Sequence, residues 1–242
     1  AITTSGQLSI RWIERDVNQY LNDLLKTSGH DYVIASDTDS IYVRFDKLVS
    51  QLFTKGEETQ KIVKFLDDIA RQKIEPFIEK SYQRLHEYVN SSEQKMEMSR
   101  EVIADKGIWT AKKRYILNVW DNEGVQYKEA QLKIMGIEAV KSSTPAPCRE
   151  KIKQGLKIIM NGTEKELNTF IQEFREEFMN LPPEEIAYPR SVNGLSKFSD
   201  PNGMFRKGAP IHCKGAILYN HLVRERKLGN KYPYIQEGDK IK

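Results

Sequence analysis

The spacing of apolar residues alternates between a helical and an extended period, and this alternation constrains the fold more than any other feature. Apolar side chains recur at helical spacing over residues 5–26 and over residues 57–90, where Pro76 predicts a kink or a break. Between these segments, β-branched and aromatic runs over residues 32–45 predict a β-hairpin. Long amphipathic helices beside antiparallel hairpins indicate an α+β fold.

Further strands are predicted in the middle of the chain. Residues 96–103 favour a strand, and residues 109–127 favour a second hairpin with residues 109–120 as one strand and Asp121–Gly124 as its turn. We expect one incomplete antiparallel sheet that carries both hairpins and is backed by the two predicted helices.

A joint at Pro145 and Pro147 precedes a second, mostly helical lobe that we place at residues 141–242. Two helices are predicted there, at residues 152–160 and 163–179, and the second begins with a Thr-x-x-Glu capping box. The Gly- and Pro-containing tail that follows shows no clear period.

Length and charge describe a globular protein with a mildly basic balance. The chain has 242 residues, 39% of them hydrophobic, and a net charge of +4, which permits a nucleic-acid partner without requiring one. Lys and Arg outnumber Asp and Glu by 11 to 7 over residues 101–160 and by 11 to 4 over residues 187–242. Residues 163–186 carry seven acidic and two basic residues, so the second hairpin and the tail are the candidate anion-binding surfaces.

Cys148 and Cys213 lie in no CxxC or Cys/His cluster, which indicates reduced thiols in an intracellular protein without structural zinc. No apolar run approaches the roughly 20 residues that span a bilayer, and no signal-peptide pattern opens the chain. We therefore expect a cytoplasmic protein with no membrane partner. The amphipathic pattern begins almost at Ala1, without an initiator Met, which indicates a piece of a longer protein.

Asp37 and Asp39 place two like charges at the tip of the first hairpin. In an extended chain residues i and i+2 share a face, so the two carboxylates can lie close enough for repulsion to raise the pKa of one of them. One interpretation is a bent turn whose carboxylates face water and accept local N–H groups. Another is a site for a hard divalent cation of the magnesium type, as used in nucleotidyl transfer.

Two other carboxylate sites are excluded. An EF-hand loop requires an oxygen ligand, a Gly and a Glu at the positions where this chain has Ile41, Tyr42 and Leu48. An aspartic protease requires Asp-Thr-Gly, and Asp39 stands at the position of that Gly.

The residues from Lys112 to Arg114 form a contiguous basic run in the second predicted hairpin. A solvated strand and a phosphate-binding surface are both compatible with this run. The aromatic residues Trp109, Tyr115 and Trp120 around it can stack on bases or pack within the sheet.

Several segments in a fixed order carry a family resemblance. They are Asp37–Ser40 (DTDS) between two apolar strands, Lys112–Tyr115 (KKRY), Leu132–Glu138 (LKIMGIE) and Lys141–Pro145 (KSSTP), preceded by residues 1–15. DTDS resembles motif C and KKRY the KxY motif of family B DNA polymerases of the T-even bacteriophage type. LKIMGIE and KSSTP together resemble the passage from palm to thumb of that family, and residues 1–7 and 12–15 resemble its helix after the fingers.

This resemblance implies an architecture and a chemistry. It implies a palm-type antiparallel sheet with two hairpins backed by helices in residues 1–140, followed by a partial, mostly helical thumb in residues 141–242. It implies Mg²⁺ as the cofactor of two-metal nucleotidyl transfer, and primer-template DNA and dNTPs as substrates in the cytoplasm of an infected bacterium. It also allows a sliding clamp as a partner.

The resemblance assigns candidate catalytic residues. Asp39 matches a direct ligand of the catalytic metal pair, and Asp37 matches a supporting carboxylate. Glu101 matches a carboxylate close to the metal site, and an exposed strand-edge glutamate is the alternative interpretation. The family usually has Tyr-Gly directly before the DTDS motif, whereas this chain has Ala35-Ser36, which restricts the backbone before the turn.

The same resemblance assigns candidate DNA contacts. Lys113 and Tyr115 match positions that touch the primer-template duplex near the primer end, and we expect Lys112 and Arg114 to meet phosphates. Such contacts position a duplex without reading its sequence.

The chain has no segment that resembles the exonuclease motifs, motif A or the fingers motif. Because two-metal transfer needs carboxylates on both sides of the metals and fingers that hold the incoming phosphates, we expect the chain to be inactive by itself. It would then be an excised segment or a split-gene product that depends on the N-terminal exonuclease, palm and fingers portion. The alternatives are a stand-alone duplex DNA-binding module and a structural subunit that binds only protein.

Overall fold

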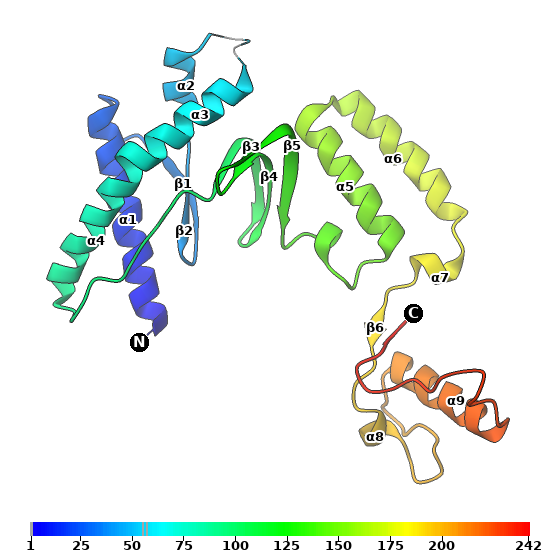
Figure 1. The fold of residues 1–242 in the computed structure, drawn as a ribbon. Coiled ribbons are helices and arrows are strands. Elements are labelled where there is room, and N and C mark those ends of the chain that lie inside the picture. Colours follow the sequence, from blue (N-terminus) through cyan, green and yellow to red (C-terminus); the bar gives the residue numbers. More distant parts are fainter. Residues whose placement is uncertain (1, 55, 57) are drawn as a thin grey trace. The chain divides into compact units, whose positions relative to one another are not determined.

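The computed structural model describes residues 2–54, 56 and 58–242 (Figure 1). Two predicted segments begin at residues outside the described ones. The amino-terminal segment of the family resemblance begins at Ala1, and the second predicted helix begins at Glu57. The chain divides after Met135 into two compact units. The assignment of residues 1–140 to a palm and of residues 141–242 to a thumb stays a prediction.

The first unit combines helices with small antiparallel sheets, so the predicted α+β class is confirmed. The predicted helix at residues 5–26 is α1, and the one at residues 57–90 is the run from α3 to α4. In chain order the elements are α1 (Ile2–Leu24), β1 (Val33–Asp37), β2 (Ser40–Val43), α2 (Asp46–Leu52), α3 (Thr59–Ile69), the π-helical turn η1 (Ala70–Ile74), α4 (Glu75–Val89), β3 (Val102–Ala111), β4 (Arg114–Asn122) and β5 (Val125–Met135).

The second long helix continues through Pro76. The π-helical turn η1 directly precedes the first turn of α4, which contains this proline. A π-helical turn is a common cause of a helix irregularity, and here it accommodates a residue that has no N–H to donate. The predicted kink or break is therefore a π-helical irregularity in a continuous helical run, which ends where Asn90 adopts a left-handed conformation with φ +48°.

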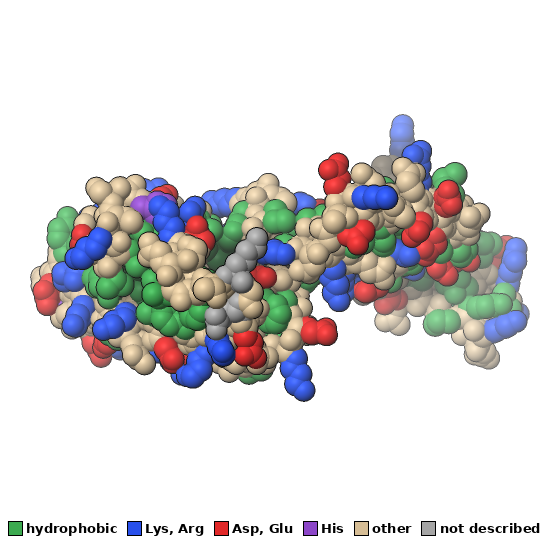
Figure 2. All heavy atoms as spheres, turned by 90° about the horizontal axis from the view of Figure 1, so that it is seen from above, with side chains coloured by type: hydrophobic (Ala, Val, Ile, Leu, Met, Phe, Trp, Pro, Cys, Tyr) green, Lys and Arg blue, Asp and Glu red, His purple; other side chains and the backbone are tan. Residues whose placement is uncertain are grey.

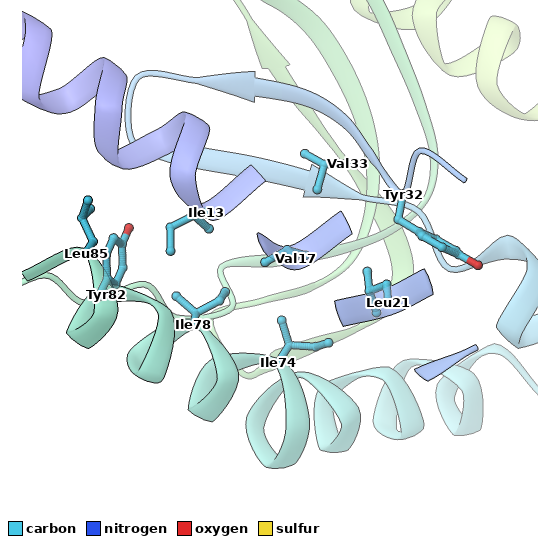
Figure 3. Close-up of a cluster of buried hydrophobic side chains, with 9 residues drawn as sticks. All are labelled: Ile13, Val17, Leu21, Tyr32, Val33, Ile74, Ile78, Tyr82 and Leu85. Atoms are coloured by element: carbon cyan, nitrogen blue, oxygen red, sulfur yellow. The ribbon is translucent and has the colours of Figure 1, made fainter. Parts of the chain in front are cut away.

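One apolar core joins α1, α4 and the first hairpin (Figure 3). Its residues on the two helices recur at intervals of three or four, which places them on one face of each helix. They are Ile13, Val17 and Leu21 of α1, Ile74 at the end of η1, and Ile78, Tyr82 and Leu85 of α4, and they meet Tyr32 and Val33 at the start of β1.

Asn18 of α1 fixes the start of the first hairpin. Its Oδ1 accepts the N–H of Tyr32 at 2.8 Å and that of Val33 at 2.9 Å. One helical turn later, Nδ2 of Asn22 donates to the carbonyl of His30 at 2.7 Å. These bonds attach β1 to α1, so the turn at the far end of the hairpin is carried by a rigid base.

The two hairpins lie in separate sheets rather than in the single predicted sheet. Among the described residues, β1 pairs with β2, and β3, β4 and β5 form a second sheet in that order. The sheets meet through side chains instead of a hydrogen-bonded ladder, because Tyr42 of β2 packs against Trp109 and Tyr115 of the second sheet.

The boundaries of β3 and β4 differ from the prediction. Residues 96–101 form no strand, so only the end of the predicted strand at residues 96–103 is correct. The predicted strand at residues 109–120 is interrupted by a turn, because Ala111 pairs with Arg114 and Lys113 adopts φ +60°. Two-residue hairpin turns favour Asn-Gly or Asp-Gly, so Lys-Lys gave no turn signal.

The predicted turn between residues 121 and 124 is confirmed. It joins β4 to β5, with φ of +53° at Glu123 and +90° at Gly124. Positive φ at both central residues is the geometry of a tight turn that matches the twist of a hairpin, and Gly supplies it without steric cost.

The second unit is mostly helical, as predicted. Its elements are η2 (Glu138–Val140), α5 (Ala146–Asn161), α6 (Glu164–Met179), α7 (Pro183–Ile186), β6 (Arg190–Ser191), α8 (Leu195–Phe198), α9 (Ile211–Glu225) and β7 (Lys240–Ile241). The capping box of Thr163 and Glu166 at the start of α6 is confirmed. The tail also contains the 15-residue helix α9, which no clear apolar period announced.

Charge is mixed on the face of the molecule that Figure 2 shows. On the face shown in Figure 2, basic and acidic side chains alternate with apolar ones rather than gathering by sign. Within the ranges that the structure describes, no helix is both long and apolar enough to cross a membrane.

Candidate functional site

Two hairpin turns of the first unit meet through their side chains. The first is the Asp37–Ser40 turn between β1 and β2, and the second is the Lys112–Lys113 turn between β3 and β4. The Nζ of Lys113 lies 2.7 Å from Oδ1 of Asp37 and 3.1 Å from Oγ1 of Thr38. The structure thus brings together two predicted site residues that are 76 positions apart in the sequence.

The backbone of the Asp37–Ser40 turn is tight. The N–H of Asp39 donates to the carbonyl of Asp37 at 2.6 Å, and Thr38 between them has φ +55°. A bond from residue i+2 to residue i around a positive φ is a γ-turn, which is strained, especially for a β-branched residue. Ser40 supports the turn by donating its hydroxyl to the same carbonyl at 3.1 Å. Such strain at an exposed tip is a common mark of a functional site.

Lys113 stabilises the charged form of Asp37. Its hydrogen bond is the largest cause of a lowered pKa for the Asp37 carboxyl, and the Thr38 hydroxyl, 3.0 Å from the carboxylate, acts in the same direction. A carboxyl whose pKa is lower in the folded than in the unfolded chain stabilises the fold above its unfolded pKa. That stabilisation is lost as the pH falls through the folded pKa.

We therefore expect the pKa of the Asp37 carboxyl to lie below the usual aspartate value of about 3.9. In Lys113→Met the pKa of Asp37 should rise toward that value, because the main hydrogen-bond donor to the carboxylate is lost. Carboxyl ¹³C NMR titration of the two chains measures both values, and the Asp46 carboxyl, which pairs with Arg44, is the internal control. Equal titration of Asp37 in the two chains would contradict the contact.

Asp39 has a different environment from Asp37. Its side chain is exposed, and its charge acts on α4, where it adds to burial in raising the pKa of Tyr82. The two carboxylates are therefore not an isolated pair that shares water, because Asp37 is neutralised by Lys113. This arrangement offsets the repulsion expected from the sequence and leaves Asp39 as the accessible carboxylate.

An aromatic cluster connects the two hairpins near their turns. The ring of Tyr42 lies edge-on to Trp109 at 5.3 Å and to Tyr115 at 5.4 Å between ring centroids. Burial and the neighbouring Tyr115 raise the pKa of the Tyr42 hydroxyl. Tyr115 is only 7% exposed, so the structure favours packing within the sheet over base stacking for this residue. Of the predicted DNA contacts, Lys112 and Lys113 are exposed at the turn, and Arg114 is half-buried.

Gly107 makes room for this cluster. A Cβ at this position would lie 2.7 Å from the ring of Trp109 and 2.9 Å from Leu117. We expect Gly107→Ala to lower the free energy of unfolding by about 1–3 kcal/mol, because the ring must move. Gly6→Ala is the control, since the space around Gly6 on α1 is open and the change should be neutral or slightly stabilising. Denaturant unfolding of the three chains measures the difference, and equal loss in both variants would contradict the packing.

Glu101 lies outside the meeting point of the two turns. It directly precedes β3, and its carboxylate accepts a hydrogen bond from Lys133 of β5. It lines a shallow cavity together with Arg71, Glu75 and Glu123. Its charge is a minor cause of the raised pKa of Tyr42, after burial and the neighbouring Tyr115.

The described residues do not assemble a complete metal site. Among them, no three His, Cys, Asp or Glu side chains lie close enough together to hold a metal ion. Asp37 is bound to Lys113, Asp39 is exposed and Glu101 is bound to Lys133. These three carboxylates therefore do not by themselves fit the predicted Mg²⁺.

Sequence reasoning missed the contacts that hold these groups in place. No local pattern in the sequence indicated three of these residues. They are Lys133, which binds Glu101, Arg100, which precedes Glu101, and Tyr42 of the aromatic cluster. The nearest signal was the alternation of the strand at residues 41–45, which indicated that Tyr42 and Ile41 face opposite sides.

Comparison with known proteins gives full-length matches to part of two larger proteins. The chain is 41% identical over 251 aligned positions to a DNA-directed DNA polymerase of Escherichia phage RB69. It is 35% identical over 250 positions to a DNA-directed DNA polymerase of Enterobacteria phage T4. Both alignments cover 100% of the chain, which spans only 27% of the length of each relative. No protein-family model matches the chain.

Proposed function

This chain is homologous, over its whole length, to part of the DNA-directed DNA polymerases of T4-like phages, and we propose that it carries one side of a template-directed polymerase site. In this proposal the Asp37–Ser40 turn is motif C of a family B palm, and the Lys112–Tyr115 segment holds the primer-template duplex. The observation that carries the proposal is the contact of Lys113 with Asp37, which joins the two segments at one place.

The proposed reaction is nucleotidyl transfer from a dNTP to the 3′ end of a primer. Asp39, exposed beside the neutralised Asp37, is the carboxylate we assign to the Mg²⁺ site, and Asp37 and Glu101 support it. Because the described residues assemble no complete metal-binding group, we propose that the remaining carboxylates come from another part of the polymerase. Phosphoryl-transfer metals neutralise charge on the transferred phosphate when they are bound.

The proposed DNA contacts are Lys112, Lys113, Arg114 and Tyr115. Two of them are exposed at a turn whose backbone is fixed by β3 and β4, so their charges can meet phosphates without recognition of the base sequence. Tyr115 lies beneath the turn and supports it by packing. Partners in this proposal are primer-template DNA, dNTPs, the exonuclease, palm and fingers portion and a sliding clamp, in the cytoplasm of the infected host.

Primer extension by a chimera tests the proposal. In the chimera, this chain replaces the matching 27% of the phage RB69 polymerase. We expect the chimera to extend a primer and the isolated chain to show no extension, because the isolated chain spans only a quarter of its relatives. Extension by the isolated chain would show that the chain carries a complete site. It would contradict the proposal that the chain supplies only one side of the polymerase site.

A further inference from the structure

Arg100 places a buried guanidinium directly before Glu101. Its side chain is 9% exposed. Its Nε donates to Asp67 of α3 at 3.0 Å, its Nη2 donates to the same carboxylate, and its Nη1 donates to Asp121 of β4. Asp121 is 2% exposed, so the guanidinium compensates a carboxylate that is almost fully removed from water.

The same contacts fix the backbone around Glu101. The N–H of Arg100 donates to Oε1 of Glu75 at 2.7 Å. The carbonyl of Glu101 accepts the N–H of Glu123 at 2.7 Å. Asp121, the buried partner of Arg100, also accepts the N–H of Gly124 at 2.9 Å. One carboxylate therefore holds both the guanidinium and the β4–β5 turn that binds Glu101.

This fixed point ends a long irregular segment. Residues 91–101 form no helix or strand, so their position depends on local contacts instead of a ladder. In an extended chain, successive side chains point to opposite faces. Arg100 accordingly points inward, while the Glu101 side chain is 53% exposed and meets Lys133.

We propose that Arg100 is a positioning residue that fixes the backbone of Glu101 and thereby the place from which its carboxylate projects. The inference rests on the proposed function, in which Glu101 takes part in nucleotidyl transfer. Lysine cannot replace Arg100 in this role, because the planar fork of a guanidinium binds two carboxylates at once and an ammonium group does not. The inward arginine thus determines where the outward carboxylate stands.

Hydrogen exchange of the Glu123 amide in the full chain tests the positioning directly. In Arg100→Lys, we expect this amide to exchange at least about tenfold faster after correction for global stability, because its acceptor on Glu101 is no longer held. Arg84→Lys is the matched control, since Arg84 also pairs with a largely buried aspartate, Asp16, on other elements of the same unit. Exchange of Glu123 that is no faster than in Arg84→Lys would overturn the proposal.

A double-mutant cycle in the chimera separates positioning from general stability. Arg100→Lys should lower kcat with little change in KM for dNTP, and it should have no further effect in a Glu101→Gln background. An equal loss in both backgrounds would contradict the proposal. If Glu101→Gln leaves extension unchanged while the exchange result holds, Glu101 has no part in transfer, and its positioning by Arg100 stands. Asp67→Asn, which keeps the bond of Arg100 to Asp121, provides the same readouts if Arg100→Lys does not fold.

Discussion

Charge reversal at the β3–β4 turn, in the triple variant Lys112→Glu, Lys113→Glu and Arg114→Glu, is expected to lower the affinity for primer-template DNA at least about 100-fold. The three proposed phosphate contacts would become repulsive, and each like-charge contact costs several kcal/mol of binding free energy. A loss of about 1.4 kcal/mol lowers the affinity tenfold. Fluorescence anisotropy over a series of salt concentrations measures the affinity. The salt slope should fall by about 0.9 for each phosphate contact that is lost.

A second triple variant controls for net charge. Lys61→Glu, Lys73→Glu and Lys80→Glu change the formal charge by the same amount on the α3–η1–α4 helical run. This run lies outside the proposed DNA surface. Reversing its three charges should therefore lower the DNA affinity only through long-range repulsion, which salt screens. Equal loss of affinity in the two triple variants would show that binding follows net charge and not the β3–β4 turn. Asp39→Ala should leave the affinity of the isolated chain intact.

Replacement of Asp39 by Ala in the chimera is expected to reduce primer extension by about 10²–10³-fold, since groups that stabilise transition-state charge contribute several kcal/mol. Asp39 is exposed beside Asp37, which pairs with Lys113, and it is therefore the carboxylate that we assign to the proposed Mg²⁺ site. Single-turnover extension with excess chimera measures the chemical step without product release.

Matched variants separate the role of Asp39 from its effect on the turn. Ser40→Ala removes a hydroxyl that bonds the same turn while both carboxylates remain, so it should cost far less extension than Asp39→Ala. Asp37→Asn should have an intermediate effect because Asp37 is already engaged by Lys113. A chimera with Asp39→Ala that extends primers as fast as the unchanged chimera would refute the assignment.

Local sequence patterns were sufficient to predict the elements that form the core of the first unit, which are α1, α4 and the first hairpin. The apolar residues of α1 and of α4 recur at intervals of three or four, which is also the spacing at which they meet in the core (Figure 3). The first hairpin carries β-branched and aromatic runs on both sides of its turn. In these segments the local preference and the tertiary environment agree, so the period alone located them.

The turn at Lys112–Lys113 could not be predicted in the same way. From Trp109 to the turn there is no Gly, Asn or Pro, and Lys113 takes φ +60° despite its side chain. The conformation is supported by a distant partner, because the ammonium group of Lys113 reaches Asp37 and Thr38. A residue held in an uncommon conformation by a contact far away in sequence leaves no local pattern.

The setting of Glu101 was also hidden from the sequence. The family resemblance indicated Glu101, but its fixed position depends on Arg100, Asp67 and Asp121, which come from three separate segments. Buried ion pairs between distant segments produce no periodicity, so the sequence pattern favours a strand at residues 96–103 although residues 96–101 form none. The helix α9 was missed for another reason, since its buried residues include the small Cys213 and Ala216, which add little to an apolar pattern.

We propose that this chain supplies the residues of one side of a functional polymerase site. Primer extension by the chimera tests it most directly, measured beside the phage RB69 polymerase from which the matching segment has been deleted. We expect extension by the chimera, loss of that extension on Asp39→Ala, and no extension by the deleted polymerase or by this chain alone. A stably folded chimera that binds primer-template DNA but adds no nucleotide would contradict it.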